Sequence, residues 1–237
     1  LDEAQAAEIC PLKMKIILPT LRTFLLGVVV QGALLFPSAG TFDYWQAWVF
    51  IFVFSAATNA LGVYLLVNDP ELHERRKKVG PAAESTPSQK IIITLIFLGF
   101  LSILVFCGFD RRFGWSSVPP LISLGGNALV VVGLFIDLLV LRVNRYAASS
   151  IQIERGQKVI TTGPYAIIRH PMYAGALIMM IGVPPALGSY WGFTVVALIL
   201  PILIWRILDE ERVLKQELPG YYEHTQQVHH RLIPGLW

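Results

Sequence analysis

Long apolar segments alternate with short polar ones along the chain. Four of the apolar segments, residues 16–36, 44–67, 91–109 and 119–141, are each close to the length at which a helix crosses a bilayer. A transmembrane helix needs about 20 residues to cross a hydrocarbon core of about 30 Å. The pattern therefore predicts four membrane-spanning helices in the first part of the chain, residues 1–141.

Two shorter apolar segments, residues 172–187 and 190–205, come near the end of the chain. A Gly-Ser pair at residues 188–189 lies between them and can turn the chain tightly. We therefore expect a C-terminal helical hairpin that packs among the other helices. The predicted fold is all-α, a multi-pass transmembrane helical bundle of five to six spans in a single integral membrane domain, residues 1–237.

The composition also indicates a membrane protein. Of the 237 residues, 54% are hydrophobic and 15% are charged, and the mean hydropathy is +0.58. Soluble domains carry about 25% charged residues, so this chain has too few to cover a water-facing surface. The net charge of +3 is too small for a nucleic-acid footprint, and no nucleic-acid partner is expected. Cys10 and Cys107 predict neither a disulfide nor a cysteine metal site, and no metal is expected.

Basic residues gather in the loops on one side of the predicted bundle. Cytoplasmic loops are enriched in lysine and arginine. On this rule both termini, the loop after the second span and the polar segments of the second half lie on the cytoplasmic side. The basic residues on this side are Lys13, Lys15, Arg75, Arg76, Lys77, Lys78, Lys90, Arg142, Arg145, Arg155, Lys158, Arg169, Arg206, Arg212, Lys215 and Arg231. Arg111 and Arg112 fall on the other side.

A helix boundary follows the second span. Asp69 and Pro70 have the residue types of a helix N-cap and of a first helical position. Residues 71–78 should then form a short amphipathic helix on the membrane surface. Residues 80–88, which include two prolines, should form a loose loop.

The stretch at residues 161–173 is unusual for either a solvated loop or a membrane span. It places Tyr165, Arg169, His170 and Tyr173 between apolar segments. The proline after His170 should open a helix, whose N–H groups can receive an anion. The tyrosine faces can stack a purine ring or contact a cation. The alternative interpretation is an interfacial anchor at the level of the lipid head groups.

A second polar cluster begins where the last apolar segment ends. It holds Arg206, Asp209, Glu210 and Glu211, and Arg206 and Glu210 share a helix face at i, i+4 spacing. One interpretation is a surface ion pair. The other is the charged wall of a site, because carboxylates at the end of an apolar helix are costly when they face lipid. A carboxylate in that wall can hold an ammonium group.

The remaining ionisable residues are interpreted case by case. Asp137 lies inside the fourth apolar segment and should face the bundle interior. It either serves a site or pairs with Arg142 one turn along. The histidines of the C-terminal tail, His224, His229 and His230, lack metal-ligand spacing and are predicted to be solvated.

Four motifs follow one another in the second half of the chain. They are Gly-Pro-Tyr at residues 163–165, Arg-His-Pro-Met-Tyr-Ala-Gly at 169–175, Arg206 followed by Glu-Glu at 210–211, and Gly-Tyr-Tyr at 220–222. In this order they resemble the superfamily of isoprenylcysteine carboxyl methyltransferases and phospholipid methyltransferases, which are multi-spanning enzymes that use S-adenosylmethionine (SAM). The resemblance implies a membrane SAM-dependent methyltransferase, with a lipophilic methyl acceptor that enters from the bilayer.

The resemblance also implies a division of roles along the chain. Residues 142–237 would bind SAM in a cytoplasmic pocket, and residues 1–141 would select the acceptor among the membrane lipids. The residues implied to contact SAM are Gln152, Val159, Ile160, Tyr165, Arg169, His170, Pro171, Met172, Tyr173, Glu210 and Glu211. Either Glu210 or Glu211 would hold the cofactor ammonium. The residues implied in catalysis are Arg206, which would face the acceptor, Glu210 and His170.

The acceptor itself stays open. An isoprenylcysteine-like carboxylate is already ionised at neutral pH and would need only Arg206 to orient it. A lipid amine or a thiol would need a base, for which His170 and Glu210 are the candidates. Two other functions also remain: a membrane reductase that uses a nicotinamide cofactor, and a non-enzymatic module of the same fold.

Overall fold

The computed structural model describes residues 3–77 (side chains from residue 18), 80–84, 86–147 and 156–237. These residues form eight α-helices and two 3₁₀ turns and contain no strand, which confirms the predicted all-α fold. The elements are α1 Glu3–Ala39, α2 Trp45–Asn68, α3 Pro70–Lys77, η1 Pro81–Ala83, α4 Pro87–Phe113, α5 Pro120–Val143, η2 Gly163–Ala166, α6 Pro171–Ala186, α7 Gly192–Glu217 and α8 Tyr221–Gln227.

Five helices are long and apolar enough to cross a membrane. They are α1 from Leu18 onward, α2, α4, α5 and α7. The sixth apolar helix, α6, has 16 residues and is therefore about 24 Å long, shorter than the hydrocarbon core. The prediction of five to six spans is confirmed, and the apolar helices indicate an integral membrane protein.

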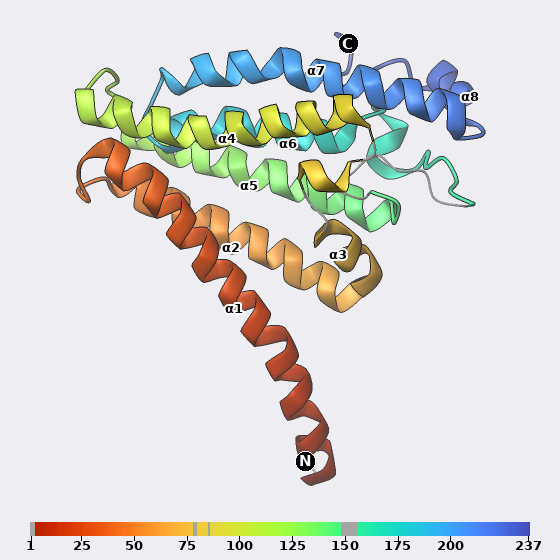
Figure 1. Ribbon diagram of the computed structural model, residues 1–237, viewed down its shortest axis with the longest axis horizontal. Coiled ribbons are helices and arrows are strands. Elements are labelled where there is room, and N and C mark those ends of the chain that lie inside the picture. Colours follow the sequence, from red (N-terminus) through yellow and green to blue (C-terminus); the bar gives the residue numbers. More distant parts are fainter. Residues whose placement is uncertain (1–2, 78–79, 85, 148–155) are drawn as a thin grey trace.

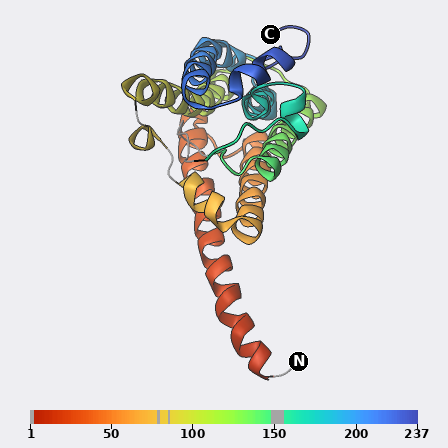
Figure 2. The same ribbon diagram turned by 90° about the vertical axis from the view of Figure 1, so that its right-hand side faces the viewer.

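The helices α4, α5, α6 and α7 run side by side, and α2 packs against α5 (Figure 1). Helix α1 crosses this group obliquely, and its N-terminal part extends away from the other helices in both views (Figure 2). With 37 residues, α1 is about 55 Å long, which exceeds the thickness of a hydrocarbon core. The predicted apolar segment at residues 16–36 is thus only the second part of one longer helix.

Glycines let α5 and α6 pack with their backbones in contact. A Cβ atom on Gly126 would lie 2.3 Å from the amide nitrogen of Ala186, and one on Gly133 would lie 2.4 Å from the carbonyl oxygen of Gly175. Only glycine allows so close an approach, as in other membrane helix pairs with small residues at the interface. The close packing brings Asp137, one turn beyond Gly133, against the first turns of α6.

Local signals set several helix starts as the sequence predicts. The backbone N–H of Leu72 donates to Oδ1 of Asp69 at 3.0 Å, so Asp69 caps α3 and Pro70 is its first residue. Helix α6 begins at Pro171, directly after His170.

Helix α7 continues well past the predicted end of the apolar segment at Trp205. It runs without interruption to Glu217, with Pro201 inside it. The polar cluster of Arg206, Glu210 and Glu211 therefore lies on the same rigid helix as the last span. Their relative positions are fixed by helix geometry.

The loop after α4 and the turn between α6 and α7 lie at the end of the bundle away from α8 (Figure 1), and a cluster of hydrogen bonds joins them. Asp110, at the end of α4, accepts from the amide of Ser116 at 2.8 Å, from the hydroxyl of Ser116 at 2.6 Å and from the hydroxyl of Ser189 at 2.5 Å. Ser189 in turn accepts from the amide of Gly192 at 2.9 Å. This cluster, called the Asp110 cluster below, ties the loop after α4 to the turn between α6 and α7.

Candidate active site

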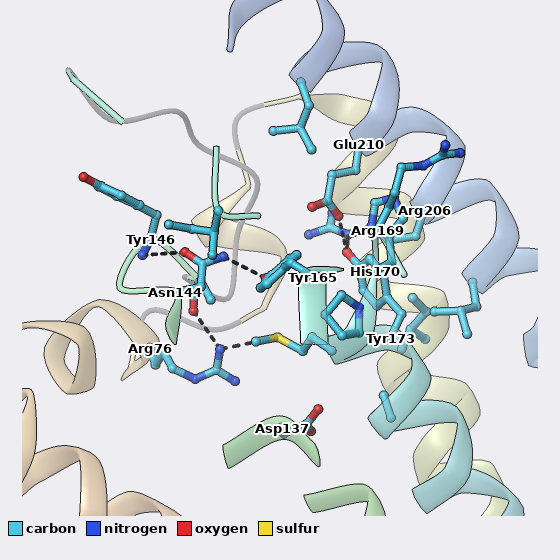
Figure 3. Close-up of a pocket in the computed structure, with 18 of the residues that line it drawn as sticks. Arg76, Asp137, Asn144, Tyr146, Tyr165, Arg169, His170, Tyr173, Arg206 and Glu210 are labelled. Atoms are coloured by element: carbon cyan, nitrogen blue, oxygen red, sulfur yellow. Dashed lines mark hydrogen bonds between the residues drawn. The ribbon is translucent and has the colours of Figure 1, made fainter. Parts of the chain in front are cut away.

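One cavity of about 500 Å³ lies between α2, α4, α5, α6 and α7, and loop residues close it at one end. Its lining changes in character from one end to the other. The deeper part is apolar and is lined by residues of the spans, among them Phe54, Ile96, Phe97, Phe100, Met179 and Leu203. The part near the loops is polar, and Figure 3 shows Tyr165, His170, Tyr173 and Glu210 among its lining side chains. A single space thus joins a membrane-like and a polar environment.

Most of the predicted site residues line this cavity. The residues that do so are Val159, Ile160, Tyr165, Arg169, His170, Pro171, Met172, Tyr173, Arg206 and Glu210. Glu211 does not line it, and Gln152 lies outside the described residues. The two polar clusters that the sequence sets apart are therefore two walls of one cavity.

Tyr173 joins these two walls. Its hydroxyl donates to Oε2 of Glu210 at 2.5 Å and accepts from Nε of Arg206 at 3.2 Å. Arg206 and Glu210 share the face of α7 that the i, i+4 spacing predicts, and both contact the same tyrosine. The bond from Tyr173 fixes the Glu210 carboxylate at the polar end of the cavity.

Arg206 is held by groups from a loop and from α4. Its Nη2 forms an ion pair of 2.7 Å with Oε1 of Glu84, and Nη1 donates to Oε1 of Gln89. Gln89 donates in turn to Asp209. The side chains of Arg206 and Glu84 are 4% and 1% exposed, so the positive charge is neutralised inside the protein.

Glu84 and Gln89 were not among the predicted site residues. Glu84 lies just after η1, within the stretch that the sequence indicates to be a loose loop. A glutamate among prolines and alanines gives no local sign of a buried ion pair. Only the tertiary fold brings it to Arg206, which is far away in the sequence.

Glu211 belongs to a separate buried network. Its Oε1 accepts from Nε of Arg169 at 2.7 Å, and its Oε2 accepts from Nε of Arg231 at 3.0 Å. Nε2 of His170 lies 3.4 Å from Oε1. Adjacent carboxylates on one helix point in different directions, so Glu210 faces the cavity and Glu211 holds the wall together.

The C-terminal tail completes that wall. The amide of Arg169 donates to the carbonyl of His230, and the amide of His170 donates to the carbonyl of Arg231, both at 2.9 Å. The tail thus fixes the backbone at the start of α6. Arg231 was predicted only as a basic residue of the tail, and no local pattern indicates this pairing.

Tyr165 and Asn144 meet at another part of the polar end. Nδ2 of Asn144 donates to the hydroxyl of Tyr165 at 2.7 Å. Burial raises the pKa of Tyr165 to about 12, so the hydroxyl stays protonated at neutral pH. Its own proton remains available for an acceptor in the cavity. Asn144, at the C-terminal end of α5, is a lining residue that the sequence analysis did not single out.

Arg76 brings a positive charge from α3 to the cavity. Its Nη1 donates to the carbonyl of Ala147 at 2.9 Å and contacts the sulfur of Met172 at 3.8 Å. The sequence indicated only a basic loop residue at this position. The surface helix α3 therefore covers the polar end of the cavity as well as following the second span.

Asp137 faces the cavity from α5 (Figure 3). Its Oδ1 is buried and has no hydrogen-bond partner in the described part of the chain. Arg142 lies over the ring of Tyr64 at 6.0 Å and forms no ion pair with Asp137 there. Of the two interpretations left open above, the pairing with Arg142 is wrong.

His224 and Tyr221 line the same cavity from α8. His224 is only 3% exposed and Tyr221 only 5%, so the prediction that His224 is solvated is wrong. Both ring nitrogens of His224 and the hydroxyl of Tyr221 lack a partner among the described residues. Burial, together with Arg169 and His170 nearby, lowers the pKa of His224 below its ordinary value. The ring is therefore neutral at pH 7.

The described residues contain no cluster of three or more His, Cys, Asp or Glu side chains that could hold a metal ion. Cys107 is a free, buried cysteine.

The comparison with protein families agrees with this geometry. The family model of phospholipid methyltransferase matches residues 121–219, which extend from α5 through α7. The matched part is similar to the membrane methyltransferase superfamily that includes the isoprenylcysteine carboxyl methyltransferases. The comparison with curated proteins gives no significant match.

Proposed function

We propose that this protein is an integral membrane methyltransferase that transfers a methyl group from SAM to a lipophilic acceptor. The family match supports the reaction class and the membrane setting. The observation that supports this proposal most strongly is the cavity itself. It is polar at the loop end and apolar among the spans, and Tyr173 holds the Glu210 carboxylate at the polar end. Such a space suits a polar cofactor and an apolar acceptor that meet within it.

The polar end offers a partner for each charged part of SAM. Glu210 is a carboxylate at the cavity wall and suits the cofactor ammonium. The faces of Tyr165 and Tyr173 suit a purine ring or a sulfonium. The orphaned donors of His224 and Tyr221 suit a carboxylate, because buried polar groups without a partner are rare unless a ligand satisfies them.

The protein's part in the reaction is to hold and orient. When bound, SAM supplies a methyl group on a positively charged sulfur. The wall residues position the reacting atoms in line, and positioning of this kind accounts for a large share of the rate acceleration in bimolecular reactions. The network of Arg206, Glu84 and Gln89 keeps the wall rigid, so that Tyr173 and Glu210 keep their geometry.

The apolar part suits a hydrocarbon chain. It is formed mainly by α2, α4, α6 and α7, whose outer faces would contact lipid. An acyl or prenyl chain that enters from the bilayer would stay in apolar surroundings there and would not be exposed to water. We propose that residues 1–141 provide much of the acceptor half and residues 142–237 most of the cofactor half.

We also propose that the polar end of the cavity faces the cytoplasm. The segments near that end carry Arg75, Arg145 and Lys158, whereas the opposite end carries Asp43 between α1 and α2 and Arg111 and Arg112 in the last turn of α4. The excess of basic residues near the cavity follows the positive-inside rule. Counting the shorter helix α6 with the five long helices gives six crossings, which would put both termini on the cytoplasmic side.

A labelling experiment tests the proposal. Purified protein in liposomes made with a total lipid extract is incubated with SAM that carries a tritiated methyl group, and label is counted in the organic phase. The wild type should transfer label, and Glu210→Gln should lose at least tenfold in kcat/KM because the ammonium loses its charged partner.

The matched control for this experiment is Glu217→Gln. Glu217 is an exposed carboxylate near the end of the same helix, so this variant should keep wild-type activity. If folded wild-type protein transfers no label to any lipid or added prenyl, amine or thiol compound, the proposed function is wrong.

A further inference from the structure

We propose that Asp137 is a catalytic residue on the acceptor side of the cavity, and that the acceptor is a nucleophile that arrives with a proton, an amine or a thiol, rather than a carboxylate. This inference rests on the proposed function and deepens it, since it names the chemical class of the acceptor. It depends on two observations: Oδ1 of Asp137 has no hydrogen-bond partner among the described residues, and every side-chain nitrogen of Arg206 has one.

Asp137 lies within a membrane-spanning helix. It sits about 9 Å along the axis of α5 from the end of that helix at Val143. An ionisable group at such a depth is costly, and in membrane proteins it usually faces a cavity or a partner and serves a function. Asp137 faces the cavity. In the described part of the chain, its Oδ1 has no hydrogen-bond partner and its carboxylate forms no ion pair.

The packing around Asp137 holds it in this position. A Cβ atom on Gly175 would lie 2.5 Å from Oδ1 of Asp137, so the carboxylate lies directly against the backbone of α6. The charged or titratable groups that act on it are Arg76 from α3 and Tyr165 from η2. Arg76 uses its guanidinium on the carbonyl of Ala147 and the sulfur of Met172. Arg76 provides a positive field near the Asp137 carboxylate, and the described contacts include no ion pair between these two residues.

Arg206, by contrast, is engaged at every nitrogen. Nη2 contacts Glu84, Nη1 contacts Gln89, and Nε contacts Tyr173. A carboxylate acceptor would have to displace Glu84, which is 1% exposed at its side chain. Leaving that carboxylate buried without its partner would cost several kcal/mol, about 3–5 for a broken buried pair.

The other buried arginine of this wall is also neutralised. Arg169 pairs with Glu211 at 2.7 Å, and both side chains are at most 6% exposed. The two arginines on the α7 side of the cavity are therefore neutralised by carboxylates of the protein. Asp137 on the α5 side has an unpartnered carboxylate oxygen among the described residues, and a carboxylate binds or receives a proton rather than another anion.

The step balances as follows. The lone pair of the acceptor nitrogen or sulfur forms a bond to the methyl carbon. The bond between that carbon and the sulfonium sulfur breaks, and its electron pair stays on the sulfur. The proton of the acceptor moves to a carboxylate oxygen of Asp137 and later leaves to solvent. A carboxylate acceptor has no proton to give and would not need Asp137.

The test begins with wild-type protein and three acceptors that share one farnesyl chain and differ only in the head group: an amine, a thiol and a carboxylate. Methyl transfer should occur to the amine or the thiol and be at least tenfold slower to the carboxylate. Faster transfer to the carboxylate would overturn the inference while leaving the proposed function intact. This comparison needs no variant, so it does not depend on the folding of any substituted protein.

The second arm uses Asp137→Asn, which keeps the size of the side chain and removes the charge. Loss of a positioned base typically costs about 10²–10⁴-fold in rate, so kcat/KM for the accepted head group should fall at least a hundredfold. The affinity for S-adenosylhomocysteine, measured by calorimetry, should stay within threefold of the wild type. Asp43→Asn, which changes an exposed aspartate of the loop between α1 and α2, is the matched control and should change neither quantity.

A third readout does not depend on turnover. Binding of the farnesyl amine or thiol to protein without cofactor, followed by tryptophan fluorescence, should be weaker in Asp137→Asn than in the wild type. If the variant instead loses affinity for S-adenosylhomocysteine, Asp137 belongs to the cofactor wall and the inference is wrong. If the wild type fails to bind S-adenosylhomocysteine, the proposed function itself fails.

Discussion

The two ends of the helical bundle both bury polar groups, but they treat them differently. At one end the Asp110 cluster gives each carboxylate oxygen of Asp110 a donor, and Asp110 is 1% exposed. At the other end, Asp137, Tyr221 and His224 line a cavity, and each has at least one polar atom without a partner among the described residues. At the first end the hydrogen bonds of Asp110 are complete and join two loops. At the second end the cavity wall keeps polar atoms that a ligand can bind.

The second end differs from the first because its polar atoms without a hydrogen-bond partner belong to residues that line a cavity. Ser123 and Asn127, on α5, also have an unpartnered side-chain oxygen, but neither lines the cavity. Conversely, Arg206 and Arg169 lie at the cavity wall but are paired with Glu84 and Glu211. Saturated networks hold the wall in place, and the open groups inside that wall are the ones expected to touch substrate or cofactor.

The largest effect on stability should come from the saturated network at the cavity end. Glu211→Gln removes the charge that neutralises Arg169, whose side chain is 6% exposed. Breaking a buried pair on one side costs about 3–5 kcal/mol, because the remaining charge stays buried. Reversible unfolding in mixed micelles measures the free energy. A loss below 1 kcal/mol would show that the ion pair is solvated, and Glu217→Gln should lose less than about 0.5 kcal/mol as an exposed change on the same helix.

A smaller loss is expected at the opposite end. Asp110→Asn replaces an acceptor of three hydrogen bonds with an amide that can accept at only one oxygen. The expected loss is about 1–3 kcal/mol in the free energy of unfolding. Affinity for S-adenosylhomocysteine should not change in the folded fraction, because the Asp110 cluster lies away from the cavity. A clear drop in that affinity would contradict the separation of the two ends.

The smallest effect on stability is expected for His224→Phe. Replacing an unpartnered buried ring by an apolar one should leave stability at pH 8 within about 1 kcal/mol, while affinity for S-adenosylhomocysteine should fall about threefold to tenfold. In the wild type the pKa of His224 is lowered in the folded state. The unfolded chain therefore binds a proton first, and this residue costs stability as the pH falls below about 6.5.

The same variant therefore makes a prediction about pH. His224→Phe should lose less stability than the wild type between pH 8 and pH 5, because its unfolded state no longer gains that proton. Unfolding midpoints at the two pH values measure the difference. Equal losses in the two proteins would show that His224 does not stay neutral in the fold.

Local signals in the sequence predicted the helices and half of the site. The cap at Asp69 and the helix start at Pro171 depend on neighbouring residues, and both are found as expected. The spacing of Arg206 and Glu210 placed them on one face, and both line the cavity. These features follow from short-range geometry, which a single sequence contains.

The rest of the site depends on contacts between distant parts of the chain. Glu84 meets Arg206, and Arg231 meets Glu211, across intervals that no local pattern spans. The burial of His224 follows from the way α8 folds back onto the start of α6, so a tail that looks polar in sequence becomes part of the wall. The identity of the carboxylate that faces the cavity, Glu210 rather than Glu211, also required the orientation of α7.

Binding of the cofactor tests the proposed methyltransferase function most directly. Calorimetric titration of the solubilised wild-type protein with S-adenosylhomocysteine, with NADPH in a parallel titration, distinguishes the candidate functions. We expect saturable binding of S-adenosylhomocysteine with a stoichiometry near one and no binding of NADPH. Binding of NADPH alone would indicate a reductase. If folded protein binds neither compound, the polar end of the cavity is a structural feature and the proposed function is wrong.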